Sequence, residues 1–154
     1  DWGFTADATA IIAVYKYDQI LYLKELLYKK RLTNNDIIEQ LNSLNIQRTD
    51  EIVADSAEPK SIEELYRSGF NIKPSKKGAD SINIGIDILK RFSLVVTKDS
   101  VNLIKELRNY KYVTDKNNKI LNKPVDAFNH AIDAIRYVAL NKLTVNRSGK
   151  YFIH

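Results

Sequence analysis

The order of the predicted elements indicates an α/β domain with a mixed β-sheet that helices cover on both faces. Strand-like runs rich in β-branched and aromatic residues come first, and helical and strand patterns alternate after them. A chain of 154 residues is long enough for one hydrophobic core and too short for two ordinary domains. We therefore expect one domain over residues 1–143, followed by a basic tail over residues 144–154.

The first half of the chain contains the clearest local signals. Residues 10–17 and 20–23 form two strand-like runs around Asp18-Gln19, which predicts a hairpin; the second run also fits a helical stripe, and hairpin order favours a strand. Thr33, with Asp36 three residues later, predicts the capping box of a helix. Residues 51–55 are a short strand that ends in an acid. A second capping box, Ser61 to Glu64, and a closing Gly69 predict the next helix.

The second half alternates between strand and helix. Short strands are predicted at 70–72 and 94–96, with a helix at about 79–91 between them that carries Ile82, Ile86 and Leu89 inward. Ser100 can cap a following helix, and the polar stretch 114–118 predicts the turn of an exposed hairpin. The last helix is expected from about Asp126 to Leu143, with Phe128, Ile132, Ile135 and Ala139 on its apolar side.

Composition excludes few classes of function. No apolar run approaches the roughly 20 residues that span a bilayer, and the absence of cysteine gives no disulfide framework. The net charge of +5 is consistent with a polyanionic partner, because Lys and Arg can neutralise phosphates, but it is equally that of an ordinary basic protein. The opening Asp-Trp-Gly looks like the end of a strand, so we expect a fragment of a longer protein.

Three acids form a candidate metal site. Asp1 and Asp55 each end a predicted strand, and ligands of open α/β sheets collect at such ends. Asp133 lies on the last helix, with His130 one turn earlier on the same face. Carboxylates that converge can hold two divalent ions for phosphodiester hydrolysis.

Each of these residues also has a structural explanation. Asp55 can cap the turn that follows it, Asp133 can face solvent, and Asp1 can belong to a turn with Gly3. Asp126, on the same side as Asp133, fits an N-cap better than a ligand. From spacing alone, both interpretations stay open.

Four segments carry a family resemblance: residues 1–9 (DWGFTADAT), 54–65 (ADSAEPKSIEEL), 77–82 (KGADSI) and 124–137 (PVDAFNHAIDAIRY). Together they resemble the C-terminal nuclease domain of the large terminase subunit of tailed bacteriophages and prophages. The resemblance covers nearly the whole chain in the same order. It implies a ribonuclease H-like fold, and an endonuclease that cuts concatemeric double-stranded viral DNA during genome packaging.

By motif match, the resemblance implies that Asp1, Asp55 and Asp133 bind two Mg²⁺ or Mn²⁺ ions. Asp1 would bridge the ions, with Asp55 on one and Asp133 on the other. His130 matches the motif's histidine, and whether it binds metal, orients water or accepts a proton stays open.

The expected partners follow from the same resemblance and from the lysines near the acids. Lys60, Lys76 and Lys77 lie in or beside the matched motifs and are the candidate DNA-binding residues, with Lys73 and Arg136 as weaker ones. An N-terminal packaging ATPase domain, a small terminase subunit and a portal are implied partners, in the cytoplasm of an infected or lysogenic bacterium. No phosphate-binding G-x-x-x-x-G-K-[ST] loop occurs in the chain itself.

Two other functions fit parts of the same pattern. The chain can be a different ribonuclease H-like nuclease, such as a Holliday-junction resolvase. It can also be a non-catalytic module that binds DNA or docks on a portal, with inert acids.

Overall fold

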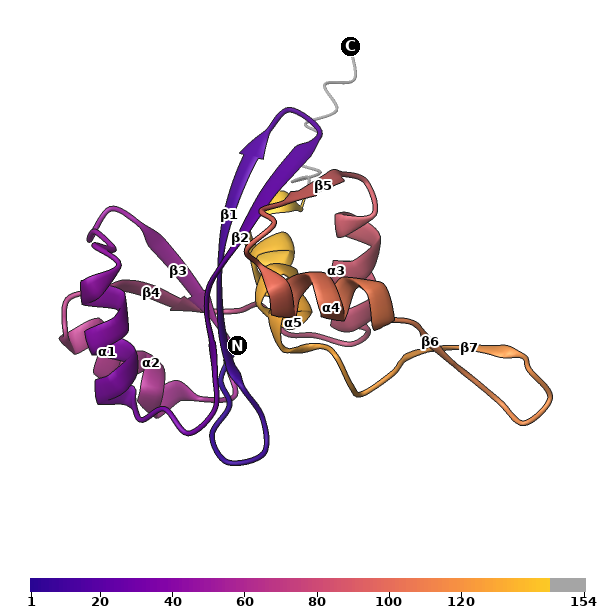
Figure 1. The fold of residues 1–154 in the computed structure, drawn as a ribbon, viewed down its shortest axis with the longest axis horizontal. Coiled ribbons are helices and arrows are strands. Elements are labelled where there is room, and N and C mark those ends of the chain that lie inside the picture. Colours follow the sequence, from indigo (N-terminus) through magenta and orange to yellow (C-terminus); the bar gives the residue numbers. More distant parts are fainter. Residues whose placement is uncertain (145–154) are drawn as a thin grey trace, which may run out of the picture.

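The computed structural model describes residues 1–144, which fold as an α/β domain (Figure 1). The elements follow one another as β1 (Thr9–Tyr17), β2 (Ile20–Lys29), α1 (Asn34–Ser43), β3 (Glu51–Ala54), α2 (Pro59–Arg67), β4 (Asn71–Pro74), α3 (Ser81–Leu89), β5 (Ser93–Val96), α4 (Val101–Asn109), β6 (Tyr112–Thr114), β7 (Ile120–Pro124), α5 (His130–Val138) and a π-helical segment, Ala139–Leu143. Apart from Thr144, the expected basic tail lies outside the described residues.

The strands form a mixed arrangement, as predicted. β1 and β2 are antiparallel, and β5 adds to β2 in parallel. β3 and β4 form a separate parallel pair, and β6 and β7 form an antiparallel hairpin that extends away from the rest of the molecule (Figure 1). The predicted first hairpin is therefore confirmed, with its ambiguous second arm as a strand.

The β1–β2 hairpin lies between two hydrophobic clusters, because alternate side chains of a strand point to opposite faces. One cluster joins the hairpin to α3, α4 and α5, and it is built around Ala10, Leu21, Leu23, Ile88, Leu89, Leu103, Ala131, Ile135, Ala139 and Leu140. The other joins it to α1, α2, β3 and β4 through Ile11 and Leu27, and it is built around Leu32, Ile37, Leu41, Ala54, Leu65, Phe70 and Ile72. Helices consequently pack on both sides of the hairpin.

A groove of about 570 Å³ runs between β1 and β3, and Asp1 is one of the residues that line it. Asp1 is fixed there by two backbone hydrogen bonds with Ala10: its main-chain nitrogen donates to the Ala10 carbonyl oxygen (2.9 Å), and the Ala10 N–H donates to the Asp1 carbonyl oxygen (3.0 Å). This reciprocal pair has the pattern of an antiparallel ladder. It holds the first predicted acid beside the start of β1.

Two local predictions for α2 and α3 were wrong. Ser61 does not cap α2, because Pro59 occupies the first turn, where its missing N–H costs nothing, and the helix begins there. Ile82 is 43% exposed, since α3 turns Ile86, Ile88 and Leu89 into the core instead. The capping box of Thr33 and Asp36 in α1, by contrast, is confirmed, as is the left-handed Gly69 (φ 99°) after α2.

The last helix begins later than predicted. Phe128 adopts a left-handed φ of 56°, which ends the preceding loop, and α5 starts at His130. Asp126 is therefore not the N-cap; that position belongs to Asn129, whose side chain makes no capping hydrogen bond. Phe128 itself is 43% exposed rather than part of the apolar side. Within residues 1–144, no helix is long and apolar enough to cross a membrane.

Candidate active site

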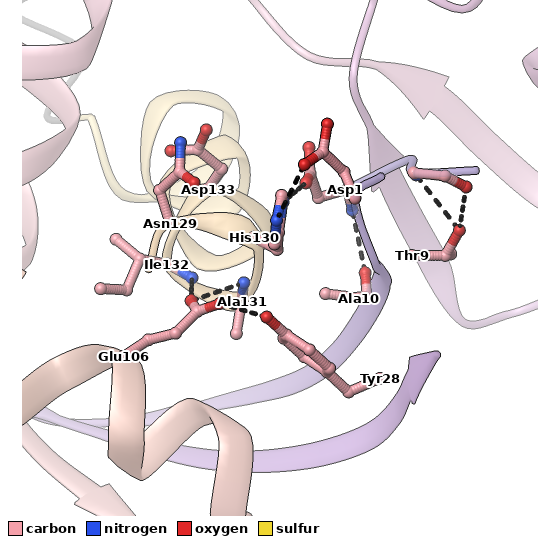
Figure 2. A network of polar contacts seen from close by, with 12 residues as sticks. Asp1, Thr9, Ala10, Tyr28, Glu106, Asn129, His130, Ala131, Ile132 and Asp133 are labelled. Carbon is pink, nitrogen blue, oxygen red and sulfur yellow. Dashed lines mark hydrogen bonds and ion pairs between the residues drawn. The ribbon is translucent and has the colours of Figure 1, made fainter. Parts of the chain in front are cut away.

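The first acid and the predicted histidine lie against each other. His130, the first residue of α5, has its Nδ1 atom 3.3 Å from Oδ2 of Asp1 (Figure 2). Its Nε2 atom lies 3.6 Å from Oδ1 of Asp7, an exposed residue of the loop before β1. The imidazole therefore bridges two carboxylates that both belong to the N-terminal motif.

Tyr137 lies on the same face of α5, two turns after His130. Its hydroxyl donates a hydrogen bond to Oδ1 of Asp1 over 3.3 Å. Burial raises the pKa of Tyr137 above its usual value, and the charges of Asp133 and Asp55 raise the pKa further. The hydroxyl is thus hydrogen-bonded to Asp1 and lies within the electrostatic influence of Asp133 and Asp55.

Asp55 follows the last residue of β3, as predicted. Its Oδ1 atom lies 2.6 Å from Nζ of Lys77 and accepts the Ala57 N–H over 3.0 Å. Burial acts to raise the pKa of Asp55, but the hydrogen bonds from Lys77 and the Ala57 N–H, together with the positive charge of Lys77, outweigh burial and hold this pKa below its usual range. Asp55 thus caps its own turn, as its structural explanation required, and is paired with Lys77.

Asp133 lies in the first turn of α5 and is paired with a buried arginine. Nε of Arg136 is 3.0 Å from Oδ1 of Asp133, and only 6% of the arginine side chain is exposed. Arg136 also stacks on Tyr137, with its guanidinium carbon 4.9 Å from the ring centre. Gly85 of α3 makes room for this arginine, because a Cβ at that position would lie 2.3 Å from Cγ of Arg136.

The chemistry of the donors fits Mg²⁺ or Mn²⁺, but their present arrangement is not that of a metal site. Carboxylate oxygens are the hard ligands that these ions prefer, and the acid side chains are only partly exposed, at 10% for Asp1, 18% for Asp55 and 19% for Asp133. Among residues 1–144, no three acidic, histidine or cysteine side chains are placed to hold a metal ion together. Asp55 and Asp133 are turned toward their basic partners instead.

The predicted DNA-binding residues have different surroundings. Lys77 contacts Asp55, and the backbone N–H of Lys76 donates to the Asn141 side chain over 2.8 Å. Lys60 lies exposed at the start of α2. Lys73 pairs with Glu51, while Arg136 is buried and therefore offers no surface for DNA.

Three further polar residues contact the site or its helix and were not predicted. Tyr137 and Asp7 were both inside the matched motifs, and the seven-residue spacing between His130 and Tyr137 places them on one helix face. Glu106 hydrogen-bonds to the start of α5, and no local pattern in the sequence indicates this role.

Comparison with known proteins identifies the family. The sequence-family model named for the terminase ribonuclease H-like domain matches residues 1–141. The chain belongs to the terminase ribonuclease H-like domain family. It is 31% identical over 140 residues to the PBSX phage terminase large subunit of Bacillus subtilis (strain 168), and 34% identical over 146 residues to the terminase large subunit of Bacillus phage SPP1.

Each alignment with these two terminases covers 89% of this chain and about a third of the relative, 32% and 34% respectively. Solved terminase structures share the fold. The nuclease domain of the SPP1 large terminase with bound Mn superposes with a TM-score of 0.80 at 28% identity, over 89% of this chain and 80% of that one. The nuclease domain of the P22 large terminase, at 15% identity, has a TM-score of 0.65 over 91% and 77% of the two chains. The ribonuclease H-like fold predicted from the motifs is thereby confirmed.

Proposed function

We propose that this domain is a metal-dependent endonuclease that cuts double-stranded phage DNA during genome packaging. The observation that carries the proposal is the grouping of the three motif acids around Tyr137, with His130 against Asp1. The Mn bound by the SPP1 nuclease domain supports a divalent ion as cofactor. The domain would work within a longer large subunit in the host cytoplasm, alongside a packaging ATPase domain, a small subunit and a portal.

In this proposal Asp1, Asp55 and Asp133 hold two Mg²⁺ or Mn²⁺ ions. Such ions supply positive charge that stabilises a phosphodiester transition state and lowers the pKa of water. His130 lies between Asp1 and Asp7, so it can accept or hand on a proton at Nε2 or Nδ1. Lys60, Lys76 and Lys77 would contact the phosphates, which gives affinity without base recognition.

Plasmid cleavage tests the nuclease directly. We expect the purified domain to nick or linearise supercoiled plasmid with Mn²⁺ and to stop doing so with EDTA. Asp55→Asn should abolish cutting, because a neutral amide binds divalent ions far more weakly than a carboxylate. Undiminished cutting by this variant would contradict the proposal. A preference for four-way junctions over linear duplex would point to a resolvase instead.

A non-catalytic docking module is the second candidate. The ion pairs of Asp55 with Lys77 and of Asp133 with Arg136 favour it, because they satisfy two of the acids without metal. Such a module would bind DNA in a salt-dependent and metal-independent way. Calorimetric titration with Mn²⁺ separates the two candidates: the nuclease should show binding that is lost in Asp1→Asn and Asp133→Asn, and the docking module should show none.

A further inference from the structure

The helix that carries His130 and Asp133 has no cap of its own. The first N–H groups of an α-helix have no partner within the helix, and a side chain at the N-cap usually accepts one of them. In α5 the N-cap residue is Asn129, and its side chain makes no such bond. The N–H groups of Ala131 and Ile132, which lie between His130 and Asp133, are buried and cannot turn to water.

Glu106 of α4 supplies the missing acceptor. Its Oε2 atom accepts the N–H of Ala131 over 2.8 Å and the N–H of Ile132 over 3.0 Å (Figure 2). Its Oε1 atom accepts the Tyr28 hydroxyl over 2.8 Å. The glutamate is 2% exposed, so both carboxylate oxygens are occupied by protein donors in a water-free place.

This contact links three elements that are distant in sequence. Tyr28 comes from β2, Glu106 from α4, and the capped residues from α5. Tyr28 also packs edge-on against the His130 ring, with 6.2 Å between the ring centres. A carboxylate at the N-terminus of a helix is stabilised by the helix dipole as well as by its hydrogen bonds.

We propose that Glu106 is the positioning residue of the active site. It fixes the first turn of α5, which keeps the His130 ring in contact with Asp1. The same turn carries Asp133 and holds it at the site. Glu106 itself contacts neither metal nor DNA. The inference rests on the proposed nuclease function for its kinetic consequence. Its direct consequence, a change in metal affinity, is measured without cleavage.

Thr33 provides a control, because it caps a helix that has no part in the site. Its hydroxyl accepts the Asp36 N–H over 3.2 Å at the start of α1. Neither Glu106 nor a proposed metal ligand lies on α1. Loss of the Thr33 cap should therefore lower stability and leave the metal site in place.

The experiment compares Glu106→Ala, Glu106→Asp, Glu106→Gln and Thr33→Ala in Mn²⁺ affinity, Tm, kcat and KM. Trp2, the single tryptophan of the chain, lies next to Asp1, so quenching of its fluorescence by Mn²⁺ reports binding directly. We expect Glu106→Ala to weaken Mn²⁺ binding by roughly 10- to 100-fold, as changes behind a metal ligand do, and to lower kcat while KM for plasmid changes little. Glu106→Gln should stay close to the wild type, because its amide oxygen can still accept both N–H groups.

The results distinguish a positioning role for Glu106 from a purely structural one. If Glu106→Ala does not fold, Glu106→Asp, which is one methylene shorter and draws the acceptor back, should still show weakened Mn²⁺ binding at an intact Tm. Wild-type Mn²⁺ affinity in Glu106→Asp and Glu106→Ala, or an equal loss in Thr33→Ala, would overturn the positioning role. A wild-type protein that binds Mn²⁺ and fails to cut DNA contradicts the proposed function alone.

Discussion

The hydroxyl of Tyr137 lies 3.3 Å from Oδ1 of Asp1. Two side chains of α5, Tyr137 and His130, therefore contact the carboxylate of Asp1. We predict that Tyr137→Phe slows plasmid cleavage by about tenfold and costs about 1 kcal/mol of unfolding free energy, since Asp1 loses a hydrogen bond in a half-buried place. Cleavage rates and urea denaturation measure the two effects. Tyr17→Phe, which removes an exposed hydroxyl at the far end of β1, is the control, and equal rates in both variants would contradict the prediction.

In the proposed metal site, Lys77 would compete with a metal ion for Asp55, because its ammonium group lies 2.6 Å from Oδ1 of that carboxylate. Lys77→Ala should therefore bind Mn²⁺ about two- to fivefold more tightly, in line with the modest strength of a partly exposed ion pair. The same change should weaken binding to DNA and make that binding less dependent on salt, if the lysine also contacts a phosphate.

Lys76→Ala is the control for the Mn²⁺ effect, since Lys76 holds the loop through its backbone N–H, which the substitution keeps. Because Lys76 is also a proposed phosphate contact, this variant should weaken DNA binding and leave Mn²⁺ affinity unchanged. Calorimetry with Mn²⁺ and a DNA filter-binding assay at two salt concentrations measure the effects. Unchanged Mn²⁺ affinity in Lys77→Ala would show that the ion pair does not compete with metal.

Local signals predicted those parts of the fold that local forces determine. The β1–β2 hairpin and the capping box of Thr33 and Asp36 follow from residues that are adjacent or three apart. The start of α5 could not be predicted in the same way, because its cap is Glu106, a residue 25 positions away on another helix. The sequence instead suggested Asp126 as the N-cap, because aspartate is a common N-cap residue, but Asp126 lies before the start of α5.

The residues of the site also divide into those that could be predicted from the sequence and contacts that could not. Motifs named Asp1 and His130, although the two lie 129 positions apart, because the family resemblance carries information about the fold that spacing does not. Neither spacing nor resemblance indicated that Asp55 and Asp133 each pair with a basic side chain. Those pairs depend on how the loop before α3 and the face of α5 lie in space, which only the folded chain determines.

Gly85 is required by Arg136, since a Cβ at this position would lie 2.3 Å from Cγ and 2.9 Å from Cδ of the arginine. Because these atoms are near the backbone and buried, the arginine cannot simply swing aside. We predict that Gly85→Ala costs about 1–3 kcal/mol of unfolding free energy, as overpacking does, and lowers Mn²⁺ affinity through the displaced Asp133. Gly78→Ala is the control, because nothing lies within 4 Å of its Cβ position. Similar Tm values for the two variants would contradict the prediction.

The stability of the domain should fall above about pH 10, because Tyr28 holds its proton more firmly when the chain is folded. Burial raises the pKa of Tyr28 above its unfolded value, and the hydrogen bond to Glu106 and the negative charge of Glu106 raise the pKa further. A group whose pKa is higher in the folded state contributes stability that is complete below the unfolded pKa and is lost as the pH rises through the folded one. Urea denaturation at pH 9, 10 and 11 should show this loss, and Tyr28→Phe should make the decline less steep because it removes one of the protons concerned. An identical pH dependence in the two proteins would show that the Tyr28 hydroxyl does not take part.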